Sequence, residues 1–344
     1  MLVNDGRVAA HHETGLADRA LRQRADTSTL WHYGSITKTL TAVAVMQLRD
    51  RGRLSLDDRV ATFIPELRQM HDPFGMMDSI TVRMLLSHSG GFRGGTWPWG
   101  EGRAWEPFEP TRWEQLAAMM PWQRLEFRPG SRYGYSNPAY VYLARIVEQL
   151  TGDPWAVYVQ KNVFLPLGMT RSYVGSTPYV LAAHRASGYT RVRDTTAAGG
   201  ERLATAGRDF DPGVTIPNSG WNAPLADLAR WAAFLAGAAP GDTASARRYE
   251  TVLARRTLDE MWRPRFPVPE GVQPAGHVGL GFFLFQDTVV GHGGEQAGFR
   301  AMLQVNPRSR RALVWVVNTV DEVRYEEARA RWHGLLAAAA PLLR

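Results

Sequence analysis

The stretch that decides the fold is Trp31-His32-Tyr33-Gly34-Ser35-Ile36-Thr37-Lys38-Thr39-Leu40. It is typical of a strand that ends at a glycine turn and passes directly into a helix. Apolar residues follow at three- and four-residue spacing up to a stop at Gly52, so the sequence predicts a buried helix over 35–51. Residues three apart share one helix face, so Ser35 and Lys38 project together from the first turn. Free backbone N–H groups in that turn favour developing negative charge.

Ser35 and Lys38 form a candidate pair of nucleophile and base. A serine hydroxyl is a poor nucleophile until a base takes its proton, and a lysine can be that base only when burial or nearby cations lower its pKa. Lys38 and Lys161 are the only lysines, and the arginines that supply the other basic side chains cannot act as bases near neutral pH. The spacing S-x-x-K also occurs by chance in helices, so this hypothesis needs support from other stretches.

The composition is that of a large folded protein. The 344 residues are 44% hydrophobic and 21% charged, which suits one complex domain or two closely packed ones. The lack of cysteine excludes disulfides and thiolate metal sites. Because no H-E-x-x-H motif or carboxylate cluster has ligand spacing, no metal or cofactor is expected. The net charge of +7 comes from scattered arginines without a nucleic-acid-binding motif, so nucleic acid is not an expected partner.

Membrane and export signals are absent from the sequence. No apolar run approaches the roughly 20 residues of a membrane helix, and the first residues contain neither a basic nor an apolar signal region. We therefore expect no membrane partner and a cytoplasmic location, or export if a leader precedes this sequence. The oligomeric state cannot be read from the sequence.

The order of predicted elements indicates an α+β fold. A hairpin over 1–13 is followed by an irregular segment over 14–28 and a short strand before Ser35. Helices are predicted over 81–88, 112–121, 138–150, 153–163 and from 223. Strands are predicted over 278–285, 288–292, 299–305 and 312–318, before a last amphipathic helix over 322–342. This pattern predicts an antiparallel sheet flanked by helices, with a mostly α-helical subdomain.

We expect a single catalytic domain over 1–344. Its sheet region would comprise 1–34 and 215–344, and its mostly helical region 35–214. The polar, glycine-rich residues over 195–213 are expected to form a long surface loop.

Two further stretches carry candidate chemistry. Tyr135-Ser136-Asn137 lies on a loop that enters a helix, where Tyr135 can relay protons and Asn137 can hold a substrate carbonyl and the lysine ammonium. Gly291-His292-Gly293-Gly294-Glu295 ends a predicted strand, and its glycines would let a substrate approach the main chain closely. The structural alternatives are an ordinary turn for the first stretch and a strand-edge bulge, with an exposed histidine, for the second.

Other aromatic and histidine residues are ambiguous. The glycine-rich loop with Trp97 and Trp99, followed by Trp105, is either a wall of a binding cleft or a satellite hydrophobic cluster. His12 and His88 are expected to be structural.

Taken in order, Ser35-Ile36-Thr37-Lys38, Tyr135-Ser136-Asn137 and His292-Gly293-Gly294 resemble the three motifs of the penicillin-binding protein and serine β-lactamase superfamily. The resemblance spans nearly the whole chain. With its Y-x-N and H-G-G motifs, the sequence is similar to class C β-lactamase-like hydrolases, which include family VIII carboxylesterases, alkaline D-peptidases and D-aminopeptidases. There are two departures from the family pattern. No first helix precedes the opening hairpin, and His292 replaces a lysine whose cation helps bind the substrate carboxylate in β-lactamases and D,D-peptidases.

The resemblance implies an acyl-enzyme mechanism. Ser35 would attack a carbonyl, while Lys38 and Tyr135 would share the acid and base work in an order that the sequence leaves open. Asn137 and His292 would orient the substrate.

Two backbone N–H groups, those of Ser35 and Glu295, would hold the oxyanion beside Gly293 and Gly294.

Short-acyl carboxylic esters are the favoured substrates. His292 is neutral over much of the physiological pH range, and Trp97 and Trp99 can line an apolar acyl site. The alternatives are a β-lactamase, a D-amino-acid peptidase or amidase, and a non-enzymatic penicillin sensor or inert scaffold. A nucleophile-elbow hydrolase is a weaker rival, because no G-x-S-x-G motif is present.

Overall fold

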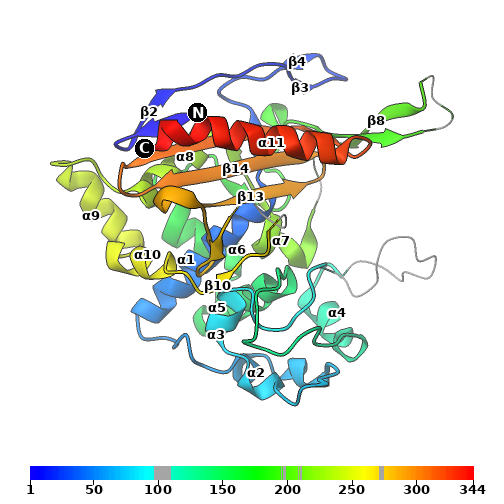
Figure 1. Cartoon of the computed structure of the whole chain (residues 1–344), viewed down its shortest axis with the longest axis vertical. Helices are drawn as coiled ribbons and strands as arrows, with labels where there is room; N and C mark the ends of the chain where they lie inside the picture. Colours follow the sequence, from blue (N-terminus) through cyan, green and yellow to red (C-terminus); the bar gives the residue numbers. More distant parts are fainter. Residues whose placement is uncertain (97–109, 195, 197–198, 208, 210, 271–274) are drawn as a thin grey trace.

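The computed structural model of the protein describes residues 1–96, 110–194, 196, 199–207, 209, 211–270 and 275–344. An eight-stranded sheet forms its upper half in Figure 1, and neighbouring strands in it are antiparallel. In spatial order the strands are β10 (Phe266–Pro267), β11 (His277–Val278), β12 (Phe283–Leu284), β13 (Val290–Gln296), β14 (Phe299–Asn306), β15 (Arg311–Val317), β1 (Leu2–Asn4) and β2 (Arg7–Ala10). The predicted α+β class is confirmed.

The pairing of β13 determines where the sheet meets the rest of the molecule. β13 pairs along its whole length with β14, from Val290 opposite Val305 to Gln296 opposite Phe299. On its other side, β12 pairs with Val290 and Gly291. The rest of β13 lies against the 3₁₀ turn Gly34–Ile36, which carries Ser35.

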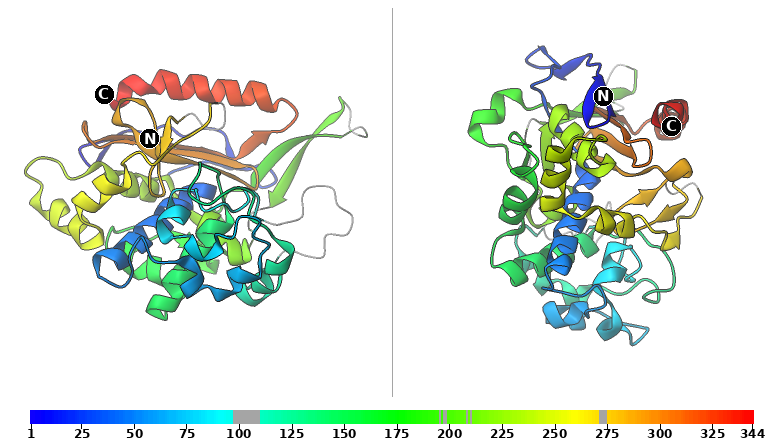
Figure 2. Two further views of the ribbon diagram at one scale, coloured as in Figure 1. Left: turned by 60° about the horizontal axis from the view of Figure 1, so that its bottom comes forward. Right: turned by 90° about the vertical axis from the view of Figure 1, so that its left-hand side faces the viewer.

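Helices cover both faces of the sheet. α8 (Leu225–Ala236) packs against β14 and β15 on one face, while α11 (Tyr325–Ala339) lies across the other (Figures 1 and 2). The rings of Trp315 on β15 and Trp332 on α11 stack with centroids 4.6 Å apart and planes 7° apart. A short 3₁₀ turn, Ala340–Leu343, follows α11.

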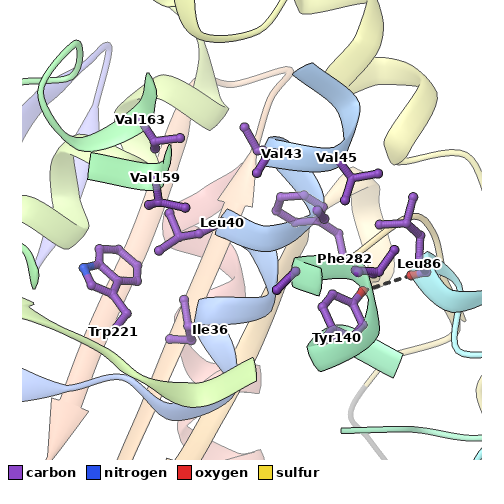
Figure 3. Packing of buried hydrophobic residues seen from close by; sticks show 14 of the residues in the cluster. Ile36, Leu40, Val43, Val45, Leu86, Tyr140, Val159, Val163, Trp221 and Phe282 are labelled. Carbon is purple, nitrogen blue, oxygen red and sulfur yellow. Dashed lines mark hydrogen bonds between the residues drawn. The ribbon is translucent and has the colours of Figure 1, made fainter. Parts of the chain in front are cut away.

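The main helix of the core is α1 (Thr37–Asp50), and every residue from Thr37 to Leu48 is buried. Figure 3 shows its apolar side chains between two walls, one with Val159 and Trp221 and the other with Tyr140. The remaining helices are α2 (Val60–Phe63), α3 (Val82–Leu86), α4 (Trp113–Ala118), α5 (Pro138–Thr151), α6 (Trp155–Val159), α7 (Ile216–Ser219), α9 (Thr243–Val252) and α10 (Arg255–Met261). Because α1 is enclosed on all sides, its first turn is held rigidly between sheet and helices.

The described residues also form three smaller sheets. One orders β16 (Thr319–Asp321), β7 (Gly188–Arg193) and β8 (Glu201–Gly207), another pairs β3 (Leu16–Asp18) with β4 (Gln23–Arg24), and the third orders β5 (Leu30–His32), β9 (Trp221–Pro224) and β6 (Tyr173–Val174). β5 is the strand that leads into Ser35.

Four local predictions are wrong. Residues 201–207 form β8 instead of a loop, because pairing with β7 orders a strand that has no apolar alternation in its sequence. The segment 14–28 likewise contains β3 and β4. Ala223 and Pro224 end β9, and the helix begins at Leu225.

The fourth correction concerns the strand predicted over 278–285, which is two strands, β11 and β12. The backbone N–H of Gly279 donates to the carbonyl of Phe282 at 2.8 Å, and Gly281 has a positive φ of 79°. A left-handed glycine in a closed turn reverses the chain and interrupts the strand. The opening hairpin and the last helix are confirmed.

Within the described ranges, no helix combines the length and apolar character needed to cross a bilayer.

Candidate active site

The turn that carries Ser35 contacts strand β13, and a glycine lies at this contact on each side, Gly34 in the turn and Gly294 in the strand. Gly34 has a φ of 50°, and a Cβ added to it would lie 3.0 Å from the backbone nitrogen of Glu295. A Cβ on Gly294 would lie 1.9 Å from the carbonyl oxygen of Tyr33 and 3.0 Å from the nitrogen of Ser35. The strand β13 and the Ser35 turn therefore touch through their main chains.

Lys38 is completely buried behind Ser35. Its Nζ lies 3.0 Å from Ser35 Oγ and donates to Asn137 Oδ1 at 2.8 Å and to the carbonyl oxygen of Asn218 at 3.0 Å. Burial lowers the pKa of Lys38 well below its ordinary value. A neutral amine can donate to the two oxygens of Asn137 and Asn218 and keep its lone pair for the Ser35 proton.

Tyr135 lies beside both Ser35 and Lys38. Nζ of Lys38 lies 4.9 Å from the centre of its ring. Burial raises the pKa of the Tyr135 phenol, and a hydrogen bond with the Ser35 side chain partly offsets that rise. The phenol is therefore a proton donor at neutral pH. Asn137 immediately precedes α5, whose first residue is Pro138, so the predicted loop enters a helix.

His88, expected from the sequence to be structural, lies beside Tyr135 in the site. It is buried, and its ring stacks on Tyr135 with centroids 4.5 Å apart and planes 30° apart. Its Nδ1 accepts a hydrogen bond from the backbone N–H of Ser136 at 3.0 Å. Burial and then the charge of Lys38 lower the pKa of His88. The sequence placed His88 at a helix end, but no sequence signal linked it to Tyr135.

His292 is buried instead of exposed, which contradicts the bulge alternative. The stretch 291–295 also lies inside β13, which runs on to Gln296. Burial, followed by the charge of Lys38, lowers the pKa of His292 to about 3, so the ring is neutral. Its Nδ1 donates to the carbonyl of Gly293 at 2.5 Å, and its Nε2 has no hydrogen-bond partner among the described residues.

A cavity of about 370 Å³ opens beside these residues. The predicted site residues that line this cavity are Ser35, Tyr135, Asn137, His292, Gly293, Gly294 and Glu295. Its far wall, which the sequence did not predict, includes Arg300 and Trp315 from the sheet and Arg329 and Trp332 from α11. Glu295 and Arg300 form an ion pair at its rim.

The predicted wall residues Trp97, Trp99 and Trp105 lie outside the described residues. A second cavity, of about 430 Å³, lies at α8, α9 and α10 and contains none of the predicted site residues. Among the residues that the structure describes, no three His, Cys, Asp or Glu side chains form a group that could hold a metal ion.

Comparison with known proteins places the chain in a family. The family model described as Beta-lactamase matches residues 1–338, so the chain belongs to the Beta-lactamase family. A putative D-alanyl-D-alanine carboxypeptidase of Escherichia coli K12 is 33% identical over 175 residues, which are 49% of this chain and 40% of that relative. The chain thus spans less than half the length of this relative.

Two solved structures share the fold. The octameric penicillin-binding protein homologue from Pyrococcus abyssi is 26% identical, has a TM-score of 0.74, and matches over 92% of this chain and 68% of its own. The D-amino acid amidase from Ochrobactrum anthropi SV3 is 19% identical, with a TM-score of 0.77 over 99% of this chain and 92% of its own. The fold is that of serine hydrolases of the β-lactamase and penicillin-binding protein superfamily.

Proposed function

We propose that this protein hydrolyses carboxylic esters with short acyl chains through an acyl-enzyme on Ser35. The observation that carries the proposal is the buried amine of Lys38, 3.0 Å from Ser35 Oγ. Burial lowers the pKa of this amine well below its ordinary value and so favours the neutral form that can accept the serine proton.

The acid and base roles follow from the two opposite pKa shifts. Lys38 has a lowered pKa and takes the proton of Ser35 as the hydroxyl attacks the carbonyl carbon. Tyr135 has a raised pKa, keeps its proton, and delivers it to the leaving oxygen as the ester bond breaks. Water then attacks the acyl-enzyme, and its proton passes back through the same two groups. Asn137 holds the Lys38 amine in place throughout.

The oxyanion is held by the backbone N–H groups of Ser35 and Glu295. The contact between β13 and the Ser35 turn supports this role, since it leaves no room for a side chain at Gly294 and little at Gly34. Donors fixed by the main chain need no reorganisation as charge develops, and loss of one typically lowers kcat by about 10²–10³.

The chemistry of His292 favours a substrate without a carboxylate. A neutral, buried imidazole supplies no cation to bind one. Esters with short acyl groups meet this requirement, and the aromatic side chains of Trp315 and Trp332 offer apolar surface in the same cavity.

Hydrolysis of a D-amino-acid amide is the second candidate. It also requires no carboxylate beside the scissile bond, and it is supported by the similarity to the D-amino acid amidase over 99% of this chain.

The test is a series of p-nitrophenyl esters from acetate to decanoate, with D-phenylalanine amide and a chromogenic cephalosporin in parallel. Ser35→Ala is compared with Ser131→Ala, which makes the same change at an exposed serine. We expect turnover that is highest for the shortest esters, vanishes in Ser35→Ala and survives in Ser131→Ala.

The other outcomes distinguish the alternatives. Cleavage of the amide with untouched esters would replace the ester assignment by an amidase. Activity that persists in Ser35→Ala would overturn the nucleophile, and a stable adduct on Ser35 without turnover would indicate a sensor.

A further inference from the structure

A third buried histidine lies close to Ser35 and does not line the cavity. His32 is the last residue of β5, three residues before Ser35, and its side chain is 1% exposed. Its Nδ1 lies 2.8 Å from Oδ1 of Asn222 on β9, and its Nε2 lies 2.9 Å from Oε1 of Gln296 at the end of β13. One ring thus joins three strands.

The hydrogen bonds determine the protonation of this ring. The amide nitrogen of Asn222 donates to the carbonyls of Gly175 and Gly220, at 3.2 and 3.0 Å, so its oxygen must face His32. Nδ1 therefore carries the proton. Burial and the Arg185 guanidinium lower the pKa of His32 to about 4, which leaves Nε2 as an acceptor. Two acceptors cannot share a hydrogen bond, and the oxygen and nitrogen of a glutamine amide are interchangeable in placement, so we assign the NH₂ group of Gln296, in place of Oε1, to the position that faces Nε2.

Two of the strands that His32 joins, β5 and β13, lead to or carry the two proposed oxyanion donors. β5 runs directly into the turn that presents the N–H of Ser35. Gln296 directly follows Glu295, whose N–H is the second donor. Gln296 also precedes Ala297 and Gly298, both with positive φ, at the turn between β13 and β14. The hydrogen bond to His32 therefore anchors β13 where the strand ends.

We propose that His32 is a positioning residue, which sets the separation of the Ser35 and Glu295 N–H groups by tying Gln296 to β5. It acts through the two strands and does not contact the substrate. The inference rests on the proposed function, since it concerns the oxyanion site of the acyl-enzyme mechanism.

The test compares His32→Phe, which keeps a flat ring without nitrogens, with Gln296→Met, which keeps the length of the side chain without its amide. The double variant and His71→Phe, the same change at an exposed histidine, complete the set. The first readout is the rate at which an alkyl fluorophosphonate labels Ser35. In this reaction Ser35 Oγ bonds to phosphorus, fluoride leaves and Lys38 takes the proton, whatever the natural substrate is.

Ser35 is expected to be labelled about 10- to 100-fold more slowly in both single variants. This decrease in rate is smaller than the one that follows when an oxyanion donor is removed. The double variant is expected to equal the slower single variant, because both changes break one connection. His71→Phe is expected to match the wild type. A second readout is the ratio of kcat/KM for p-nitrophenyl acetate and its thiono analogue. Sulfur accepts hydrogen bonds poorly, so a displaced donor lowers the preference for oxygen.

The contrary results separate this inference from the proposed function. A wild-type protein that is not labelled on Ser35 would overturn both. Two results would overturn the role of His32 alone, provided that the wild type is labelled on Ser35. One is a Gln296→Met variant that is labelled at the wild-type rate, and the other is a Gln296→Met variant whose oxygen-to-sulfur ratio is unchanged. Gln296 is half-buried at a strand end, so its variant decides the question even if His32→Phe does not fold.

Discussion

At the scale of single residues, the chemistry of this site depends on where one amine is buried. Lys38 is enclosed by α1, α5 and α7, and its contacts at hydrogen-bond distance are Ser35, Asn137 and the carbonyl of Asn218. Such surroundings hold the amine in one place and disfavour its charged form. The pKa of the neighbouring Tyr135 phenol is shifted in the opposite direction, upward, so the phenol stays protonated.

The pH dependence of kcat/KM follows from these two shifts. A base with a lowered pKa is active above that pKa, so we expect activity to be lost as the pH falls through the pKa of Lys38. Because the pKa of Tyr135 is raised, its deprotonation is expected to cause no loss of activity below its ordinary value of about 10. The measurement is hydrolysis of p-nitrophenyl acetate between pH 5 and about 10, the upper limit set by that same value.

Lys38→Arg gives the sharpest comparison, because a guanidinium keeps its proton at every accessible pH. We expect kcat/KM to fall by about 10²–10⁴-fold in this variant. The loss of activity at low pH that is attributed to protonation of Lys38 should also disappear from its pH profile. Lys161→Arg is the matched control at the other lysine, which is exposed and pairs with Asp153. An arginine variant at position 38 with the wild-type profile would show that another group is the base.

The sequence predicted the pairing of Ser35 with Lys38 because helical geometry alone places residues three apart together. It could not predict His88 or Asn218, since their contacts with the site come from distant parts of the chain. His88 reaches Tyr135 across 47 positions, and Asn218 contributes a backbone carbonyl, which no residue type reveals.

At the scale of elements, the site is made by the contact of β13 with the turn before α1. Gly293 and Gly294, two of the three glycines of β13, are not equivalent in this contact. Gly294 faces the carbonyl of Tyr33, whereas a Cβ on Gly293 would meet the end of the flexible Met302 side chain at 3.3 Å.

We therefore expect Gly294→Ala to separate β13 from the Ser35 turn. A Cβ 1.9 Å from a backbone oxygen requires movement of the main chain, and overpacking of this kind costs about 1–3 kcal/mol of unfolding free energy. Gly293→Ala is the control, since Met302 can move aside at little cost. Denaturant unfolding gives the two free energies, and equal losses in both variants would contradict this account of the contact.

Elements with a strong internal pattern were predicted and those held by pairing were not. The buried helix after Ser35 and the strands β14 and β15 are rich in apolar residues. β8, with the sequence ERLATAG, has no regular apolar alternation, so its strand conformation depends on pairing with β7. The placement of α11 over the cavity likewise depends on contacts between elements.

At the scale of the whole molecule, the two ends of the chain meet on the sheet that carries the site. The amino group of Met1 donates to the carbonyl of Val314 at 2.8 Å, so β1 is anchored at the strand that also bears Trp315. Near the other end of the chain, the side chain of Asn306 on β14 donates to the carbonyl of Leu343 at 2.8 Å. α11 is thereby fixed at its end, and the stacked pair Trp315–Trp332 fixes its middle.

This arrangement predicts that Trp332 controls substrate binding more than chemistry. The indole forms part of the far wall of the cavity and touches none of the reacting groups in the proposed mechanism. In Trp332→Ala, α11 loses the stacking contact, worth about 0.5–1.5 kcal/mol beyond its buried area. We expect KM for p-nitrophenyl esters to rise severalfold while kcat changes little, because the wall is lost and the Ser35, Lys38 and Tyr135 geometry stays intact.

Leu335→Ala is the matched control, since Leu335 lies on the same helix and its side chain is 56% exposed. Kinetics and thermal unfolding are measured for both variants. A fall in kcat in Trp332→Ala as large as the rise in KM would mean that α11 also holds β13 in place. Equal effects from both variants would instead reflect a loosened helix, without a specific wall.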